Sequence, residues 1–378
     1  MVLLVGWLVA RLVYLQLAKA ATPVQAPGGS PRVDTLEVIK TTLTVLAFAG
    51  ALLTGLYAYR KQRLAEGDAS RADAQQFADR YSKSAEQLGS EQAAVRLAGV
   101  YAMARLADDW RTQRQTCIDV LCAYLRMPYQ PREAEGHRPG EDQVRKTILK
   151  VIIEHLQDDV ATGWGRADFD LTGAILEDAS LSGAVFGGRA VFSKVQFQGP
   201  THILDTTFLT DAVFDEAEFT DDVSFGGSRF LCGSSFKSSH FKSVAMFGEA
   251  EFVGESWFSA ATFGQESWFS NSSFRSGASF YQTRFCGESH FDGAIFSGRA
   301  WFGQGLFVGD CSFHDATFAG VALFTSAELS GRPWFGQATF RASASFANAS
   351  ISPEGVDALT EATFLAGVER GPFIAPQP

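Results

Sequence analysis

The sequence is poor in the residues from which active sites and metal centres are commonly built. Its 378 residues include only 4 Met, 5 Cys and 6 His. The cysteines are odd in number and irregularly spaced, which excludes a disulfide framework and a zinc-binding pattern. Basic residues are also scarce, because 42 Asp and Glu outnumber 32 Lys and Arg and leave a net charge of −10. This balance excludes a basic nucleic-acid-binding protein. The chain is instead rich in Phe (33) and Gly (36), an excess that predicts an internal repeat.

Two apolar segments near the N-terminus predict membrane spans. The clearer one is residues 41–59, which carry no charge and lie between Lys40 and the basic run 60–63. A helix of this length crosses the roughly 30 Å hydrocarbon layer of a bilayer. Residues 2–18 form a second candidate span, although Arg11 interrupts it and a signal peptide is the alternative interpretation. The basic run favours a cell-membrane protein with its C-terminal part in the cytoplasm, although basic residues on the other flank weaken that asymmetry.

Residues 64–160 show helical periodicity and predict a stalk followed by a small α-helical module. Apolar residues recur at steps of three and four in three stretches. The predicted inward faces are Val95, Ala98, Ala102 and Leu106, then Ile118, Leu121, Cys122 and Leu125, and finally Val144, Ile148, Ile152 and Leu156. Pro128 ends the second helix, and the proline-rich segment from there to Gly140 predicts a loop.

From about Phe169 the sequence becomes strictly periodic. Leu171, Leu176, Leu181 and Phe186 are five residues apart, and from Phe186 to Ile351 the spacing alternates between six and five. This second series has 31 members, of which 28 are Phe, so it contains most of the 33 phenylalanines in the chain. Four successive units give a coil of about 22 residues.

Each unit predicts one very short strand. A small residue stands two positions before each large one, for example Ala190 before Phe192. Two residues is the period of a strand, so both side chains point inward and the mostly polar residue between them points outward. Coils stacked about 4.8 Å apart would bury these inward faces. Phe258 is therefore expected to lie between its equivalents Phe236 and Phe280 in a continuous column.

The first units carry a resemblance to a known family. Ala174-Ile175-Leu176, Ala179-Ser180-Leu181 and Ala184-Val185-Phe186 place alanine two residues before a central Leu or Phe. In this pattern the chain resembles pentapeptide-repeat proteins. It looks like the Phe-rich type common in actinobacteria, in which membrane segments and a short helical region precede the repeats. Residues 85–89 and 117–129 are similar to that helical region.

The resemblance implies an all-β fold, a right-handed quadrilateral β-helix, preceded by the small α-helical module and one or two transmembrane helices. The regular sixth residue departs from the basic family pattern. We expect it to form a bulged corner on two opposite sides of each coil.

These features divide the chain into four predicted regions. Residues 1–63 form a membrane region, residues 64–160 the helical stalk and module, and residues 167–351 the pentapeptide-repeat β-helix. Residues 352–378 form a C-terminal cap and tail, in which the helix-like stretch 354–365 is expected to cover the last coil.

No catalytic, cofactor-binding or metal-binding constellation can be found in the sequence, so no site residue is assigned and no cofactor is expected. The histidines form no ligand pair at helical or hairpin spacing. Four tryptophans occupy outward positions of the repeat. Trp257 and Trp301 are two coil lengths apart, and Trp268 and Trp334 are three, so each pair is predicted to share a face. Exposed tryptophans are typical of partner surfaces, although scattered surface aromatics are the simpler interpretation.

The net charge of the protein falls entirely on the repeat region. Residues 167–351 contain 20 acidic and 10 basic side chains, whereas the rest of the chain contains 22 of each. Some pentapeptide-repeat proteins imitate DNA with an acidic rod and bind a topoisomerase, but the charge here is much sparser than that of a phosphate backbone.

The sequence therefore favours a non-enzymatic, membrane-anchored scaffold whose partners are the lipid bilayer and an unidentified protein. The alternative is an acidic, DNA-mimicking inhibitor of a DNA topoisomerase. Binding to nucleic acid itself is not expected.

Overall fold

The computed structural model describes Trp7 and residues 11–16, 18–19, 35–130, 138–157 and 163–373. The chain divides into two compact units, Met1–Asp79 and Arg80–Pro378, which are described separately. Most of the predicted span at residues 2–18 lies outside the described residues.

The first unit is dominated by helix α2 (Thr35–Leu88), which continues into the second unit. Its apolar part is largely exposed, and Phe48 and Leu53 each leave about two thirds of their surface uncovered (67% and 68%). Ile39–Leu88 is the one helical stretch among the described residues that could cross a membrane by length and composition. The predicted span at 41–59 lies within it.

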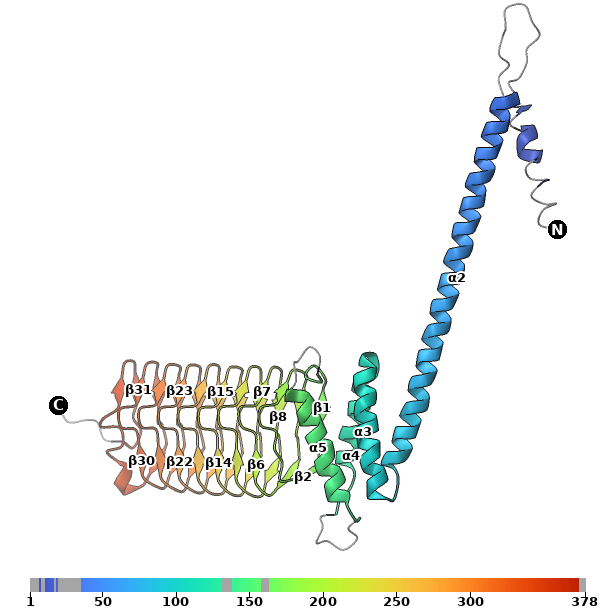
Figure 1. Cartoon of the computed structure of the whole chain (residues 1–378). Coiled ribbons are helices and arrows are strands. Elements are labelled where there is room, and N and C mark those ends of the chain that lie inside the picture. Colours follow the sequence, from blue (N-terminus) through green and yellow to red (C-terminus); the bar gives the residue numbers. More distant parts are fainter. Residues whose placement is uncertain are drawn as a thin grey trace, which may run out of the picture. The chain divides into compact units, whose positions relative to one another are not determined.

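A module of three helices opens the second unit (Figure 1). It consists of α3 (Ala93–Asp109), the short 3-10 turn η1 (Arg111–Gln113), α4 (Arg114–Arg126) and α5 (Glu141–Gln157). The faces predicted for α4 and α5 are confirmed, since all eight apolar side chains named for them are buried.

The face predicted for α3 is only partly correct, because Leu106 is buried as predicted but the buried side of the helix is centred elsewhere. Ala98 is exposed, whereas Val100, Met103 and Ala107 are buried. Alanines lie on every side of this helix, so its apolar pattern selects no single face. Its orientation is decided by Arg96, which lies on the buried side and contacts residues distant in the sequence.

The rest of the second unit is a solenoid of about nine coils in four parallel sheets (Figure 1). We number the sheets I to IV in the order in which the chain visits them. Sheet I contains β1 (Phe169–Asp170), β4 (Ala190–Val191), β8 (Ala212–Val213), β12 (Ser234–Ser235), β16 (Ser256–Trp257), β20 (Ala278–Ser279), β24 (Ala300–Trp301), β28 (Ala322–Leu323), β32 (Ala344–Ser345) and β35 (Val368–Glu369). Sheet II contains β2 (Ile175–Glu177), β5 (Gln196–Gln198), β9 (Glu218–Phe219), β13 (His240–Phe241), β17 (Thr262–Phe263), β21 (Arg284–Phe285), β25 (Leu306–Phe307), β29 (Glu328–Leu329) and β33 (Ser350–Ile351). Sheet III contains β6 (Thr201–His202), β10 (Val223–Ser224), β14 (Ala245–Met246), β18 (Ser267–Trp268), β22 (Ser289–His290), β26 (Cys311–Ser312) and β30 (Pro333–Trp334). Sheet IV contains β3 (Val185–Phe186), β7 (Thr207–Phe208), β11 (Arg229–Phe230), β15 (Glu251–Phe252), β19 (Ser273–Phe274), β23 (Ile295–Phe296), β27 (Thr317–Phe318), β31 (Thr339–Phe340) and β34 (Thr363–Phe364).

The register confirms the predicted coil of 22 residues. Ser234 pairs with Ser256, for example, and Phe241 with Phe263. Inside the solenoid the Phe258 ring stacks on that of Phe236, with ring centres 4.8 Å apart. It meets Phe247 of another column edge-to-face at 5.5 Å. Both arrangements suit the charge distribution of aromatic rings, and the columns fill the interior as a packed core.

Units of five and six residues alternate along the chain, and the extra residue of each longer unit lies at a corner of the coil. Where the spacing is five, the corner is a tight turn closed by a backbone hydrogen bond, as from the N–H of Ala217 to the carbonyl of Phe214. The residue before the small inward one then has positive φ, for example 56° at Glu216. Where the spacing is six, the corner lacks this bond, and at several of these corners a side chain of the preceding coil binds the backbone instead. The N–H of Gly233, for example, donates to Asp211 at 3.0 Å.

The module packs on the first coil. Arg145 of α5 donates to the carbonyls of Tyr124 and Leu125 at the end of α4 and to that of Ile175 in β2. A helix end has carbonyls without intrahelical partners, so this one buried side chain satisfies them and joins the helices to the sheet.

The far end of the solenoid differs from the prediction. Residues 354–365 do not form a helix but a 3-10 turn, η2 (Pro353–Gly355), followed by further turns and by β34. The coil pattern resumes, and Phe373 packs edge-to-face on Phe346 with ring centres 5.1 Å apart. An aromatic side chain therefore covers the last ring of its column.

Candidate partner-binding surface

Potential metal ligands are dispersed among the described residues. No group of three or more His, Cys, Asp or Glu side chains among them could hold a metal ion. Burial raises the pKa of Cys117 to about 11, and burial, aided by Asp119, raises that of Cys122 to about 12. Both thiols stay protonated at neutral pH, so neither is an activated nucleophile.

The four outward tryptophans lie on two of the four sheets, paired as predicted. Trp257 and Trp301 belong to sheet I, and Trp268 and Trp334 belong to sheet III. Trp268, Trp301 and Trp334 leave 36%, 37% and 43% of their surface exposed, and Trp257 is half-buried. Sheets I and III therefore form two tryptophan faces.

On sheet I the two indoles border a hollow of about 650 Å³. Its floor is the intervening coil, where Gly277 and Ser279 leave space between the larger neighbours. The ammonium group of Lys237 lies 4.7 Å from the centre of the Trp257 ring, and Tyr281 contacts Trp301 with ring centres 4.4 Å apart. The indoles are thus held by neighbours and keep an open side.

On sheet III, Trp268 lies among polar neighbours. Trp268 stacks on His290 with ring centres 3.8 Å apart, and its N–H donates to Glu266 at 3.2 Å. The carboxylates of Glu288 and Asp292 lie 3.5 and 3.7 Å from the two ring nitrogens of His290. Charged and imidazole groups therefore surround this indole.

Sheets II and IV have a different character, because they carry ion pairs between coils. On sheet IV, Glu251 binds Arg229 of the preceding coil at 2.8 Å and also contacts Arg275. The hydrogen bond from Arg229 lowers the pKa of Glu251 below its ordinary value of 4.5. On sheet II, Lys242 contacts Glu218. We call these the charged faces.

Comparison with known families identifies the solenoid. The family model described as pentapeptide repeats (9 copies) matches residues 192–240, 214–262 and 258–304. The solenoid is a pentapeptide-repeat domain. No curated protein and no solved structure matches the chain in the same comparisons.

Several acidic side chains of the pentapeptide-repeat domain accept hydrogen bonds from the neighbouring coil. Asp211 and Asp310 each accept a hydrogen bond from a backbone N–H of the next coil, at 3.0 and 2.8 Å. Asp215 accepts both the hydroxyl of Ser235 and the backbone N–H of Lys237. These carboxylates stabilise corners, so some of their oxygens are already bound by neighbouring coils although their charge remains.

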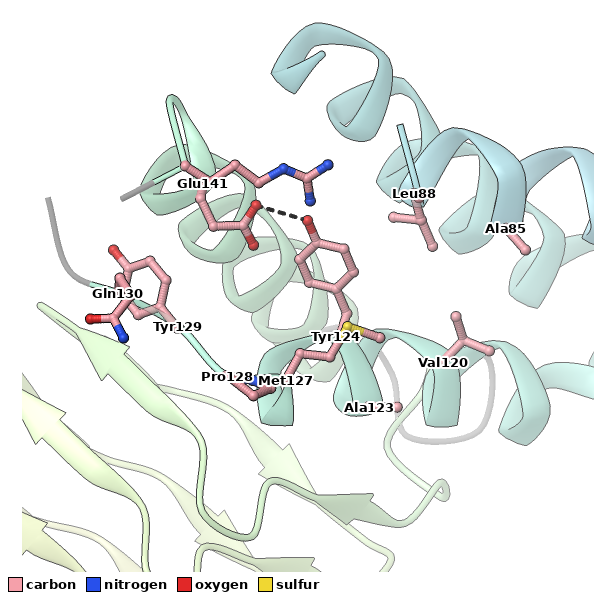
Figure 2. Close-up of a pocket in the computed structure, with 12 residues that line it drawn as sticks. Ala85, Leu88, Val120, Ala123, Tyr124, Met127, Pro128, Tyr129, Gln130 and Glu141 are labelled. Carbon is pink, nitrogen blue, oxygen red and sulfur yellow. Dashed lines mark hydrogen bonds between the residues drawn. The ribbon is translucent and has the colours of Figure 1, made fainter. Parts of the chain in front are cut away.

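The helical module carries a second concave site, a groove of about 500 Å³ (Figure 2). Leu88 of α2 forms one wall, and the other is formed by Val120 and Ala123 of α4 with Met127 directly after it. The sequence did not indicate this groove, because its walls come from segments that only the packing of the module brings together.

Proposed function

We propose that this protein is a membrane-anchored scaffold whose pentapeptide-repeat domain binds a protein partner through the tryptophan face of sheet I. The observation that carries this proposal is the pair Trp257 and Trp301, which border one hollow with a floor of small residues. Tryptophan is the residue type most enriched at energetically dominant positions of protein interfaces. The alternation of bulky and small side chains leaves a depression into which a side chain of the partner can insert.

The anchor in this proposal is the apolar part of α2, and the pentapeptide-repeat domain lies in the cytoplasm. The basic run 60–63, directly after the predicted span, supports this orientation. Protease treatment of right-side-out and inverted membrane vesicles tests it. The domain should be cleaved or released only when the cytoplasmic face is accessible, and cleavage from the outside would reverse the orientation.

Equivalent positions in neighbouring coils of sheet I supply a conservative substitution with which to test the partner surface. Ser235 and Ser279 occupy the outward position in coils next to Trp257 and Trp301, so serine fits this position without disturbing the coil. The double variant Trp257→Ser, Trp301→Ser should keep its melting temperature and lose at least about tenfold in partner recovery, since a truncated hot-spot residue costs 2 kcal/mol or more. The measurement is quantitative affinity capture from membranes of the native host.

Two matched variants make the result specific. Trp268→Ser with Trp334→Ser removes the same number of indoles from sheet III, where Ser224 and Ser312 occupy equivalent positions. His240→Thr alters a charged face in the manner of Thr262 in the next coil. Equal loss in all three variants, or no reproducible partner in any, would contradict a site on sheet I.

The alternative, an inhibitor that imitates DNA, has less support. It needs acidic side chains free to replace phosphates, and several carboxylates of the domain are bound to backbone N–H groups or to basic side chains. A DNA supercoiling assay decides the question, because inhibition at micromolar protein would favour the alternative.

A further inference from the structure

We propose that the groove of the helical module is a binding site for a single-chain amphiphile with an anionic head, specifically a long-chain fatty acid. This inference is independent of the partner surface on sheet I. It rests on the shape of the groove, on the polar groups of its walls and on one cation among its lining residues.

The groove has the size and lining of a small-molecule site. Its volume of about 500 Å³ lies within the roughly 300–1,000 Å³ typical of ligand pockets. Ala85 and Leu88 of α2 lie across it from Val120 and Ala123 of α4 and from Met127, which follows α4 (Figure 2). Met127 leaves 56% of its surface exposed, so an apolar ligand would cover surface that now faces water.

The polar groups of the walls are already engaged. The hydroxyl of Tyr124 donates to Glu141 Oε2 at 3.0 Å, and the Nε atom of Arg96 lies 3.2 Å from the same oxygen. Burial, aided by Glu141, raises the pKa of Tyr124 to about 12, so the hydroxyl remains a donor. Arg96 balances the charge of Glu141, and the carboxylate therefore presents little net charge to a ligand.

The backbone at the end of α4 is satisfied as well. The carbonyls of Ala123 and Tyr124 accept the N–H of Met127, and Arg145 binds those of Tyr124 and Leu125. A peptide in the groove would bring N–H and C=O groups that find few partners on these walls, and unpaired polar groups are costly to bury. A hydrocarbon chain brings none. The walls thus favour an acyl chain over a peptide.

Arg138 supplies the complementary charge for the head of the ligand. It lines the groove, and its Nη2 donates to the carbonyl of Ser90 at 2.7 Å, which holds the exposed side chain at the α2 end. Arginine carries five N–H donors in a planar fork that matches a carboxylate, so it can bind one while keeping the bond to Ser90. A fatty acid satisfies both the apolar walls and this cation.

Photolabelling tests the proposal on the full-length protein in lipid nanodiscs. The probe is hexadecanoic acid with a terminal diazirine, and the labelled peptides are mapped by mass spectrometry. We expect labels in residues 85–89 and 120–130 that excess hexadecanoic acid removes. Ala123→Phe, which fills the groove from a half-exposed position, should reduce these labels at least about tenfold. Ala98→Phe, on an exposed part of α3, should leave them unchanged.

The head group is tested by Arg138→Gln against Arg111→Gln, an exposed arginine outside the groove. Only the first variant should weaken labelling by the acid, and it should not affect the methyl ester of the probe. Thermal melting of each variant separates loss of binding from loss of folding. Labels confined to residues 41–59, labelling that is insensitive to Ala123→Phe, or equal labelling by acid and ester would each overturn the proposal. Labelling of the groove by a diazirine diacyl phosphatidate but not by the acid would also overturn it and assign the groove to a bilayer lipid.

Discussion

The solenoid and the helical module bury their cores in opposite ways. In the solenoid every coil repeats the same solution, a stacked phenylalanine such as Phe258 beside a small residue such as Ser256, so no single contact is unique. In the module the decisive contacts are unique and polar, as where Arg145 joins α4, α5 and sheet II. The difference shows that a repeat derives its stability from periodicity, whereas the element that caps it depends on individual side chains.

The largest effect is expected from Phe258→Asp in the middle of the solenoid. The variant removes a stacked ring and buries a carboxylate without a partner. The rings above and below it in the same column cannot move apart to let water reach the carboxylate. We expect loss of cooperative unfolding in residues 80–378, which form a compact unit, measured by circular dichroism during heating. Glu255→Ala, three residues earlier and exposed, should change the melting temperature little. Similar melting curves for the two variants would contradict the inward position of Phe258.

An intermediate effect is expected where the module meets the solenoid. Arg145→Met leaves the carbonyls of Tyr124, Leu125 and Ile175 without this donor, and we expect a loss of about 2–4 kcal/mol in the free energy of unfolding. The measurement is urea denaturation of residues 80–378.

The neighbouring residue on α5 provides the control for this variant. Lys146→Met removes an exposed ion pair with Asp178, 2.7 Å long, and should cost no more than about 1 kcal/mol. Equal losses in the two variants would mean that the capping contacts of Arg145 contribute nothing beyond a surface charge.

The smallest effect concerns the charged face of sheet IV and depends on pH. The pKa of Glu251 in the folded protein is below 4.5, chiefly because Arg229 donates a hydrogen bond to it and Arg275 lies close. A lowered pKa means that this carboxylate stabilises the fold above pH 4.5 and that the contribution is lost as the pH falls through the folded value. Glu251→Gln should therefore cost up to about 1 kcal/mol at pH 7 and almost nothing once the wild-type carboxyl is protonated.

Urea denaturation at a series of pH values measures this effect. Glu249→Gln, on an exposed side chain at a tight corner where glutamine occurs in other coils, should show no such dependence. A loss that persists undiminished at low pH would show that the ion pairs are not its source.

The sequence was a sufficient guide to the solenoid for a physical reason. Alternation between five and six residues is a local property repeated many times, so the inward Phe258, the 22-residue coil and the shared faces of Trp257 and Trp301 follow from counting. The position of the extra residue could be predicted too, since only a corner tolerates it without turning the next side chain outward. The faces of α4 and α5 followed from the helical period in the same way.

Tertiary structure decided whatever depends on a single encounter between distant segments. The buried face of α3 was predicted only in part, with Leu106 correct and Ala98 wrong, and it became definite only when Arg96 met Glu141, 45 positions later. The turns at residues 354–365 replaced a predicted helix because the last coil binds this segment, as in the hydrogen bond from Phe335 to the carbonyl of Ala358. The groove beside Tyr124 likewise exists only in the folded module. A periodic pattern is visible in the sequence because it is local and repeated, whereas a contact that forms once between distant segments produces no such pattern.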